Sequence, residues 1–372
     1  MGSSIRVLVV DDSALMREMV CDFLADARGI EVVGTVPNGR KALEILDSLN
    51  PDVITLDVQM PEMDGLATLD EILKRRPLPV IMFSSLTTRG ADVTLDALDR
   101  GALDYVAKPE GSNPAVHAAL REELVRKVRT MAGTDVRRML QIRRERAERM
   151  KQRPAQLTSL TPPVAKPVTH APQYNDKCIA LGISTGGPPA LASLFQTLRG
   201  PLPPIVVVQH MPPDFTKAFA WRLNSISSLT VKEAESGDIL QPNYVYIAQG
   251  GKHLHLRKEG GLVKCLVRDG DPVSGHKPSV DVMMKCAAEI YGGRCIGVVM
   301  TGMGRDGSDG CGAIRNAGGY ALGQDEASSD VYGMNKVAFV EGNLDRQFHL
   351  DEAATLISTQ VRRMWDRAAV GV

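Results

Sequence analysis

The sequence lacks the cysteine and charge patterns that mark several protein classes. Its six cysteines form no Cys-x-x-Cys pair, which argues against a zinc cluster and against a secreted disulfide framework. Lys plus Arg equals Asp plus Glu at 44 each, so the whole chain has no net attraction to nucleic acid or anionic lipid. The apolar run at residues 7–10 is too short for a signal peptide or a membrane span, and we expect no membrane insertion. These absences favour a cytoplasmic protein.

From residue 5 to about 132 the chain alternates between strand-like and helix-like segments. Short β-branched runs end in polar or glycine-containing sequence, and longer amphipathic stretches separate them. We predict five strands, at residues 5–10, 31–36, 53–57, 79–84 and 104–108. The alternation predicts an α/β fold with a five-stranded, doubly wound parallel sheet and functional groups at the carboxyl ends of its strands.

A basic segment interrupts this alternation at residues 133–175. Arginine is frequent as far as Arg153, and Pro, Thr and Ala then follow to about Pro172. This composition predicts a basic helix and then an extended tether. Glu145 and Glu148 interrupt the positive charge and aromatic residues are absent, so a solvated helix is favoured over a nucleic-acid contact. We expect no nucleic-acid partner.

Strand-like and helix-like segments alternate again from residue 176. The predicted strands are 178–183, 205–209, 295–301 and 338–340. Between them, apolar and polar residues alternate at 243–248 and at 253–256, which indicates an antiparallel ribbon or hairpin beside the parallel sheet. We therefore expect a second doubly wound α/β domain with an inserted antiparallel hairpin.

Charged residues follow three of the strands predicted in the N-terminal region. Asp11 and Asp12 come after the first strand, Asp57 ends the third and Lys108 ends the fifth. Taken singly, Asp11 or Asp12 could be a helix N-cap. Together these residues predict an acidic pocket that a hard cation such as Mg²⁺ neutralises. There Asp57 can attack a phosphoryl group, and the metal and Lys108 can stabilise the charge of the resulting aspartyl phosphate.

Two more residues belong to this expected phosphate site. Ser84 ends the fourth strand, where its hydroxyl can hydrogen-bond the phosphate, and Tyr105 on the fifth strand can move with it. Ser85 offers an alternative hydroxyl. Ser84 is preferred because it directly follows the apolar strand.

The order of these motifs resembles the receiver domain of two-component response regulators. Three segments carry the resemblance, namely 7–13 (VLVVDDS), 56–65 (LDVQMPEMDG) and 107–109 (AKP). The resemblance covers residues 4–130 and implies a flavodoxin-like fold. It also implies that Asp11, Asp12 and Asp57 hold Mg²⁺ and that a chemotaxis histidine kinase donates the phosphoryl group to Asp57.

A glycine-flanked serine, Ser184, ends the first predicted strand of the second domain. Residues 182–186 have the pattern Gly-x-Ser-x-Gly and precede a segment that opens with two prolines. Small neighbours allow the sharp turn that exposes a nucleophile's hydroxyl. A glycine-rich turn that binds a phosphate has the same letters, so the pattern needs partner residues to indicate catalysis.

A nucleophilic serine needs a general base and an orienting carboxylate. His210 ends the next predicted strand, and His276, in the loop at 274–278, is its main rival. Asp306 lies in the glycine-rich loop after residues 295–301, where a turn or capping role is the alternative. Three strand ends carrying Ser, His and Asp predict a catalytic triad. Their order along the chain differs from that of the α/β hydrolases.

These motifs closely resemble the catalytic domain of the chemotaxis protein-glutamate methylesterase family. The segments 278–283 (PSVDVM) and 325–329 (DEASS) add to a resemblance that runs from about 177 to 365. It implies that Ser184 is the nucleophile, His210 the general base and Asp306 its orienting carboxylate. It also implies that the backbone N–H of Met303 contributes to an oxyanion hole and that Thr185 assists the nucleophile.

The chain departs from the pattern of that family at two places. Asn335 stands where a proline is common, and Gly275 stands where bulkier residues are frequent. Neither position belongs to the expected triad. We expect these two differences to affect the loops on the substrate side rather than the chemistry.

The two resemblances together imply an enzyme that phosphorylation activates. Residues 4–130 would form the receiver, 131–175 a basic helix and linker, and 176–368 the catalytic domain. The implied reaction removes methyl groups from glutamates of methyl-accepting chemoreceptors, releases methanol and needs no cofactor at the esterase site; glutamine deamidation is a second implied activity. The receiver would block the catalytic site until Asp57 is phosphorylated.

Two other functions fit parts of the pattern. A DNA-binding response regulator would share the receiver, but it would have a smaller output domain with a basic face. A receiver-linked scaffold would keep both folds but have no reactive serine. Labelling of Ser184 by a serine-directed probe distinguishes the scaffold from the enzyme.

Overall fold

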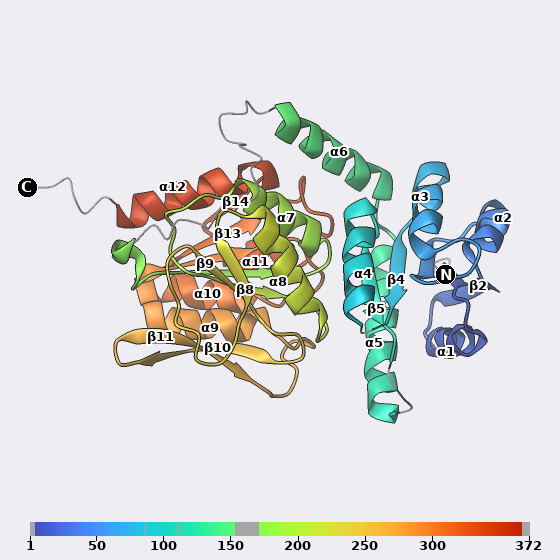
Figure 1. The fold of residues 1–372 in the computed structure, drawn as a ribbon, viewed down its shortest axis with the longest axis horizontal. Coiled ribbons are helices and arrows are strands. Elements are labelled where there is room, and N and C mark those ends of the chain that lie inside the picture. Colours follow the sequence, from blue (N-terminus) through green and yellow to red (C-terminus); the bar gives the residue numbers. More distant parts are fainter. Residues whose placement is uncertain (1–3, 86, 110, 112, 153–170, 367–372) are drawn as a thin grey trace, which may run out of the picture. The chain divides into compact units, whose positions relative to one another are not determined.

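The computed structural model describes residues 4–85, 87–109, 111, 113–152 and 171–366. The chain divides into two compact units, Met1–Lys151 and Gln152–Val372, and each contains a parallel sheet with helices against it (Figure 1). Most of the predicted tether, residues 153–170, lies outside the described residues. None of the helices in the described ranges is long and apolar enough to span a bilayer.

The first unit alternates strands and helices in chain order. Its elements are β1 (Ile5–Val10), α1 (Ala14–Ala25), β2 (Ile30–Val36), α2 (Gly39–Leu49), β3 (Val53–Asp57), α3 (Gly65–Arg75), β4 (Val80–Ser84), α4 (Thr88–Arg100), β5 (Asp104–Ala107), α5 (Pro114–Met131) and α6 (Val136–Gln152). The sheet order is β2-β1-β3-β4-β5, and every neighbouring pair is parallel. The predicted five-stranded doubly wound sheet is therefore confirmed, and each predicted strand boundary agrees to within one residue.

Buried strands and capped helices explain why this sequence forms the first unit. All residues of β3 and β4 are buried, as expected for strands covered on both faces. Ser13, Asn38 and Asp64 begin α1, α2 and α3, and the side chain of each accepts a hydrogen bond from a backbone N–H of the first turn. The chain therefore turns at each strand's carboxyl end.

The predicted basic helix is α6, but one of its faces packs against the first unit. Val136 and Met139 are buried, and Arg143 Nη1 donates a 2.7 Å hydrogen bond to the carbonyl of Leu98. Arg146 is also buried. The predicted helix is present, but one of its faces is not solvated, because hydrophobic residues at helical spacing give α6 an apolar side among its arginines.

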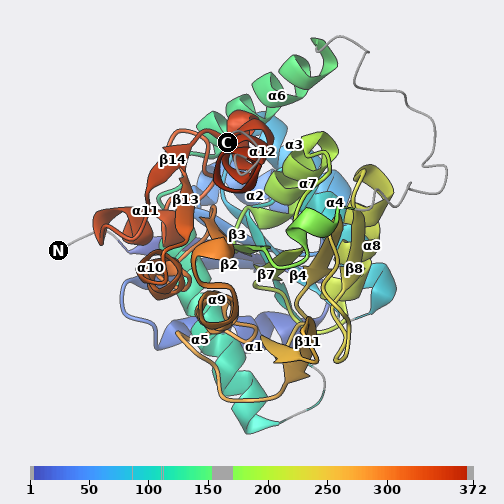
Figure 2. The same cartoon turned by 90° about the vertical axis from the view of Figure 1, so that its left-hand side faces the viewer.

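The second unit contains a larger parallel sheet. Its elements are β6 (Cys178–Ile183), α7 (Gly187–Thr197), β7 (Ile205–Gln209), α8 (Phe215–Ile226), β8 (Thr230–Glu233), β9 (Tyr244–Ile247), β10 (His253–Glu259), β11 (Leu262–Arg268), α9 (Val280–Tyr291), β12 (Cys295–Val299), α10 (Ser308–Asn316), β13 (Tyr320–Gln324), α11 (Met334–Val340), β14 (Arg346–Phe348) and α12 (Ala353–Trp365). The main sheet has the order β14-β13-β12-β6-β7-β9-β8, and its neighbouring strands are parallel. Helices α7, α8 and α12 cover one face, and α9, α10 and α11 cover the other (Figure 2).

Three expectations for the second unit need correction. Residues 338–340 belong to helix α11, not to a strand: Met334 and Ala338 are buried at helical spacing, whereas Phe339 and Val340 are exposed. Residues 243–248 contain β9, a parallel strand of the main sheet. The antiparallel hairpin is confirmed, but it consists of β10 and β11 and forms a separate sheet against α9. The parallel strands β8, β13 and β14 were not predicted.

In each sheet the direction of winding reverses beside the first strand, which is where α/β folds generally bind their ligands. In the first unit the reversal lies between β1 and β3, which carry Asp11, Asp12 and Asp57. In the second unit it lies between β6 and β12, so Ser184 and the loop that carries Asp306 share one edge. All six cysteines lie in the described ranges and are free thiols.

A close contact between β6 and α9 leads to a testable expectation about stability. A Cβ on Gly182 would overlap the Cγ1 methyl of Val280, so Gly182→Ala should lower the free energy of unfolding by about 1–3 kcal/mol through overpacking. Denaturant unfolding measures this change. Gly270→Ala is the control, because its Cβ would make an ordinary 3.4 Å contact with His253. Equal stability of Gly182→Ala and the wild type would mean that α9 shifts freely away from β6.

Candidate active site

Three carboxylates and a lysine meet at the carboxyl edge of the first sheet. Asp11, Asp12 and Asp57 each offer one oxygen, and these oxygens lie within 4.8 Å of one another. Lys108 Nζ lies 2.8 Å from Asp11 Oδ2 and 2.9 Å from Asp57 Oδ1. A pocket of about 250 Å³ opens at this point, and its lining includes Asp12, Asp57 and Lys108. The structure therefore brings together the charged groups predicted from the strand ends.

Burial and like charge act against the ionised form of Asp57. Burial raises the pKa of the Asp57 carboxyl, Asp11 adds to this effect, and Lys108 opposes it. Burial alone would lower the pKa of the Lys108 ammonium, but its hydrogen bonds and charge interactions with Asp11 and Asp57 outweigh burial and raise that pKa. Lys108 thus holds the carboxylates together as the counter-charge of the pocket.

The donor atoms of this pocket fit a hard divalent cation. Three carboxylate oxygens from Asp11, Asp12 and Asp57 are ligands of the kind that Mg²⁺ prefers. Asp12 is exposed, whereas Asp11 and Asp57 are buried, so one side of the cluster stays open to water. This openness suits Mg²⁺, which keeps several of its water ligands.

Ser84 ends β4, and Tyr105 is the second residue of β5, where it lies opposite Met82. Ser84 is fully buried and its Oγ donates to the carbonyl of Gly90 at 3.2 Å. Ser85 is partly exposed, and its Oγ lies 3.2 Å from Thr87 Oγ1. Both serines line the pocket. Tyr105 is buried, where Lys127 Nζ lies 5.3 Å from the centre of its ring.

Ser184 occupies the sharp turn between β6 and α7. Its backbone N–H donates to the carbonyl of Thr301 at 3.0 Å, and its carbonyl accepts from Gly187 at 2.7 Å. Gly186 has a φ of 76°, a left-handed conformation that favours glycine. The predicted turn therefore forms because glycine can adopt the conformation that follows the serine.

His210 links Ser184 to Asp306. His210 Nδ1 lies 3.1 Å from Ser184 Oγ, and His210 Nε2 lies 2.8 Å from Asp306 Oδ2. An ionised carboxylate only accepts hydrogen bonds, so the ring proton is assigned to Nε2, and Nδ1 is left to accept from the serine hydroxyl. This is the arrangement in which a histidine can remove the proton of a serine.

The Asp306 carboxylate is buried, and several donors replace its water. Oδ1 accepts from Ser279 Oγ at 2.8 Å, and Oδ2 accepts from the backbone N–H of Val280 at 2.7 Å. Burial alone would raise the pKa of Asp306, but His210 and the backbone N–H groups of Asp281 and Val280 lower it to about 2. Asp306 is thus ionised at neutral pH.

Ser184, His210 and Asp306 form a chain of contacts, called the contact chain below. The other predicted residues surround it. The ring of His276 stacks on that of His210, with centroids 3.7 Å apart and an interplanar angle of 6°. Thr185 is buried, and its carbonyl accepts from Thr301 Oγ1 at 3.0 Å. Met303 is buried in the loop after β12, next to Gly302, where an added Cβ would lie 2.7 Å from Ser184 Cβ. The loop of Met303 therefore borders the nucleophile.

Comparisons with known proteins match both units. The model of the CheB methylesterase family matches residues 179–357, and that of the response regulator receiver domain matches residues 7–121. A protein-glutamate methylesterase/protein-glutamine glutaminase of Pectobacterium atrosepticum is 40% identical over 96% of this chain and 97% of that protein. The chain belongs to this methylesterase/glutaminase family. The resemblance inferred from the motifs is confirmed.

Two further proteins are similar to this chain. An Archaeoglobus fulgidus protein with the same name is 44% identical over 91% of this chain and 93% of its own length. The crystal structure of the Thermotoga maritima CheB methylesterase catalytic domain is 40% identical, covers 50% of this chain and 98% of that chain, and has a TM-score of 0.49.

In this methylesterase/glutaminase family member, several buried polar residues that the sequence did not single out support the site. Gln209 Nε2 donates to the carbonyls of Ser184 at 3.0 Å and His210 at 3.2 Å. Gln324 Oε1 accepts from the backbone N–H of Thr301 at 2.9 Å. Gln209, Thr301 and Gln324 each end or directly follow an apolar strand segment. A polar residue at the end of an apolar strand was the signal in the sequence that could have identified these supporting residues.

Asn335, where the resemblance led us to expect a proline, makes structural contacts. It is buried in the first turn of α11, and its Nδ2 donates to the carbonyl of Gln324 at 2.8 Å and to Ser329 Oγ at 2.7 Å. These bonds tie α11 to the end of β13. Asn335 makes no hydrogen bond to Ser184, His210 or Asp306 among those described for it.

Lys108 contacts Asp11 and Asp57, two of the carboxylates that would also hold a cation, so the two positive charges would repel each other. Lys108→Met should therefore bind Mg²⁺ roughly tenfold more tightly, as ~1.4 kcal/mol of relieved charge repulsion would give. Calorimetric titration of the full chain with Mg²⁺ measures the affinity. Lys74→Met, which removes an exposed lysine of α3, is the control. Unchanged or weaker Mg²⁺ binding by Lys108→Met would contradict this competition.

Proposed function

We propose that the protein hydrolyses glutamyl methyl esters on methyl-accepting chemoreceptors and releases methanol. The observation that carries this proposal is the contact chain from Ser184 Oγ through His210 to Asp306 Oδ2. The names of the relatives, which specify methylesterase activity on protein glutamate, support the substrate class. In this proposal residues 176–368 form the catalytic domain, residues 4–130 the receiver and residues 131–175 the helix and linker between them, in a cytoplasmic protein.

The reaction proceeds through a covalent acyl-enzyme. Ser184 Oγ attacks the ester carbonyl while its proton passes to His210 Nδ1. The tetrahedral intermediate collapses, the bond to the methoxy oxygen breaks, and His210 returns the proton so that methanol leaves. Water then attacks the acyl-enzyme and gives its proton to His210, which passes it to the departing Ser184 oxygen. Asp306 stays ionised throughout and stabilises the imidazolium.

The charge on the tetrahedral oxygen needs donors close to the nucleophile. We assign the backbone N–H of Met303 to this oxyanion hole, because its loop borders Ser184. Thr185 assists by fixing the turn, since its carbonyl is bonded to Thr301. The esterase chemistry uses side chains and water and needs no cofactor.

Deamidation of glutamine is a second activity of the same site. A primary amide presents the same acyl group as the methyl ester, so Ser184 attacks it to give the same acyl-enzyme. His210 then protonates the leaving group, which departs as ammonia instead of methanol. The relatives carry both activities in their names.

Phosphorylation of Asp57 regulates the esterase. A chemotaxis histidine kinase donates the phosphoryl group, and Asp11, Asp12 and Asp57 hold Mg²⁺, which neutralises negative charge on the phosphoryl oxygens. Lys108 pairs with the phosphate, Ser84 hydrogen-bonds it, and Tyr105 changes position with it. The unphosphorylated receiver inhibits the catalytic domain, and the phosphate shifts a two-state equilibrium toward the open form.

Ser184→Ala should lower methanol release at least about 10³-fold, because no other group in the triad forms the acyl-enzyme. Methanol release from methylated receptor by the full chain with a phosphodonor measures the effect. Phosphorylation of Asp57, measured by phosphate incorporation, should be unchanged. The control is Ser225→Ala, which removes an exposed hydroxyl from α8. Unaltered release from Ser184→Ala would refute the nucleophile assignment.

A phosphodonor should raise methanol release by the wild type and leave release by Asp57→Asn unchanged, because the side-chain amide of that variant cannot accept the phosphoryl group. The same assay, run with and without the donor, measures both responses. Asp47→Asn, which removes an exposed carboxylate from α2, should respond like the wild type. Full wild-type release without the donor would be evidence against inhibition by the receiver.

A further inference from the structure

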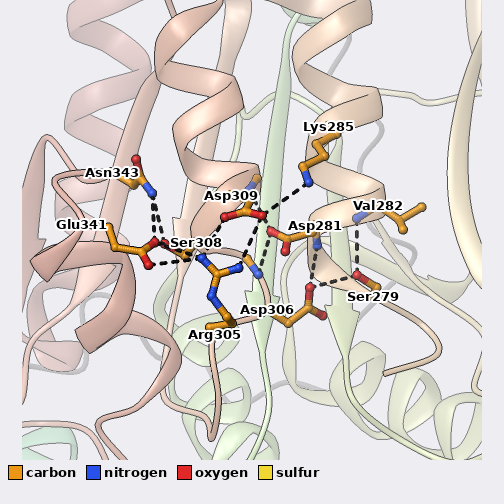
Figure 3. Close-up of polar contacts among 12 residues, drawn as sticks. Ser279, Asp281, Val282, Lys285, Arg305, Asp306, Ser308, Asp309, Glu341 and Asn343 are labelled. Carbon is orange, nitrogen blue, oxygen red and sulfur yellow. Dashed lines mark hydrogen bonds and ion pairs between the residues drawn. The ribbon is translucent and has the colours of Figure 1, made fainter. Parts of the chain in front are cut away.

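A second buried carboxylate, Asp281, lies beside the carboxylate of the contact chain. It is the second residue of α9, and both Asp281 and Asp306 are 1% exposed (Figure 3). The two side chains come from elements that are far apart in sequence, the start of α9 and the loop before α10. Two buried carboxylates in contact are unfavourable unless each has its own set of donors.

The donors to Asp306 come largely from the start of α9. Ser279 donates through its hydroxyl, and Val280 and Asp281 donate through their backbone N–H groups at 2.7 and 3.0 Å. Free N–H groups at a helix start favour a negative charge. The first turn of α9 therefore fixes the carboxylate that orients His210.

The donors to Asp281 come from the start of α10. Asp281 Oδ1 accepts from the backbone N–H of Gly307 at 2.9 Å and from that of Gly310 at 2.7 Å. Gly307 directly follows Asp306 and is the N-cap of α10. The start of α9 thus binds the carboxylate of Asp306, and the start of α10 binds the carboxylate of Asp281. The loop that carries Asp306 is therefore bonded to α9 through both carboxylates.

Glycine at both donor positions, 307 and 310, allows α9 and α10 to come close enough for these hydrogen bonds. Gly307 has a φ of 96°, and its added Cβ would come within 2.9 Å of Val280 Cγ1. A Cβ on Gly310 would lie 2.6 Å from Met284 Cβ. The start of α10 therefore packs directly on α9, which leaves the N–H groups of Gly307 and Gly310 inaccessible to water if Asp281 is removed.

We propose that Asp281 is a positioning residue of the esterase site, which acts through Asp306. By binding the N–H groups of Gly307 and Gly310, it holds the loop at the angle that keeps Asp306 on His210 Nε2. This inference rests on the proposed function, because a positioning role requires that Ser184 and His210 do the chemistry. It adds a residue that the motif assigned to no role.

The charge of Asp281 also acts on the contact chain. The titratable groups that face the Asp281 side chain are Asp306 on the loop before α10, Lys285 on α9, and Asp309 and Cys311 on α10. Burial and the charge of Asp306 raise the pKa of Asp281. Both hydrogen bonds to Asp281 are accepted by Oδ1. Asparagine keeps this oxygen and replaces Oδ2 with an amide nitrogen, so Asp281→Asn preserves the hydrogen bonds and removes the charge.

Two substitutions at Asp281 separate hydrogen bonding from charge. In the phosphorylated full chain, Asp281→Ala should lower kcat and the rate of Ser184 labelling by a fluorophosphonate about 10- to 100-fold, with KM nearly unchanged, as expected for a misplaced catalytic group. Asp281→Asn should recover most of this loss. Full recovery would mean that the hydrogen bonds of Asp281 to the loop, and not its charge, position Asp306.

Asp309→Asn is the matched control. Asp309 occupies the first turn of α10 as Asp281 occupies that of α9, but its carboxylate is half-exposed and pairs with Arg305 and Lys285 (Figure 3). Removing its charge should leave the labelling rate unchanged. A loss of labelling as large as that of Asp281→Ala would overturn the specific role of Asp281.

The remaining outcomes decide between the two proposals. A wild type that the probe does not label at Ser184 contradicts the proposed function itself. Labelling of the wild type and of a folded Asp281→Ala at the same rate overturns only the positioning role. If Asp281→Ala does not fold, Asp281→Ser decides, because its shorter side chain cannot reach both N–H groups: slower labelling with KM nearly unchanged supports the role, and labelling at the wild-type rate overturns it.

Discussion

The geometry of the second unit's site depends on keeping the Asp306 carboxylate ionised inside the protein. A buried negative charge is stable only where hydrogen bonds and an opposite charge replace its water. The donors come from His210 and from the first turn of α9, so three separate elements must meet at one point. Gly182 serves the same requirement because it lets α9 approach β6. The acidic pocket of the first unit differs from this enclosed carboxylate, because Asp12 is exposed and one side of the pocket stays open for an exchangeable cation.

Strand ends made much of this molecule predictable from its sequence. Buried parallel strands appear as short apolar runs, and the polar residue that follows each run lies at the functional edge of the sheet. This rule brought Asp57 and Lys108 to one edge and Ser184, His210 and Asp306 to another, where the structure has them in contact. The family and the fold class are confirmed. The catalytic roles of these residues are still predictions.

Features that depend on distant contacts could not be read from the sequence. Residues 338–340 look like a strand because they are apolar, but partners on α10 and β13 make them part of a helix. Strand β14 has three residues, too few for a periodic signal. Gln209 and Asp281 are ordinary polar residues in the sequence, and their roles depend on carbonyl and N–H groups that the fold brings to them. Such partners follow from tertiary structure alone.

The contact chain also spans very different lengths of polypeptide. Ser184 and His210 are 26 positions apart, whereas His210 and Asp306 are 96 positions apart. Contacts between distant segments form slowly, since the entropy of closing a long loop opposes them. The contact between Ser184 and His210 lies across the β6–β7 pair, whereas Asp306 is carried by the loop after β12, which pairs with the other edge of β6. The complete contact chain therefore needs both strand pairs, and its long-range member bears the larger entropy of loop closure.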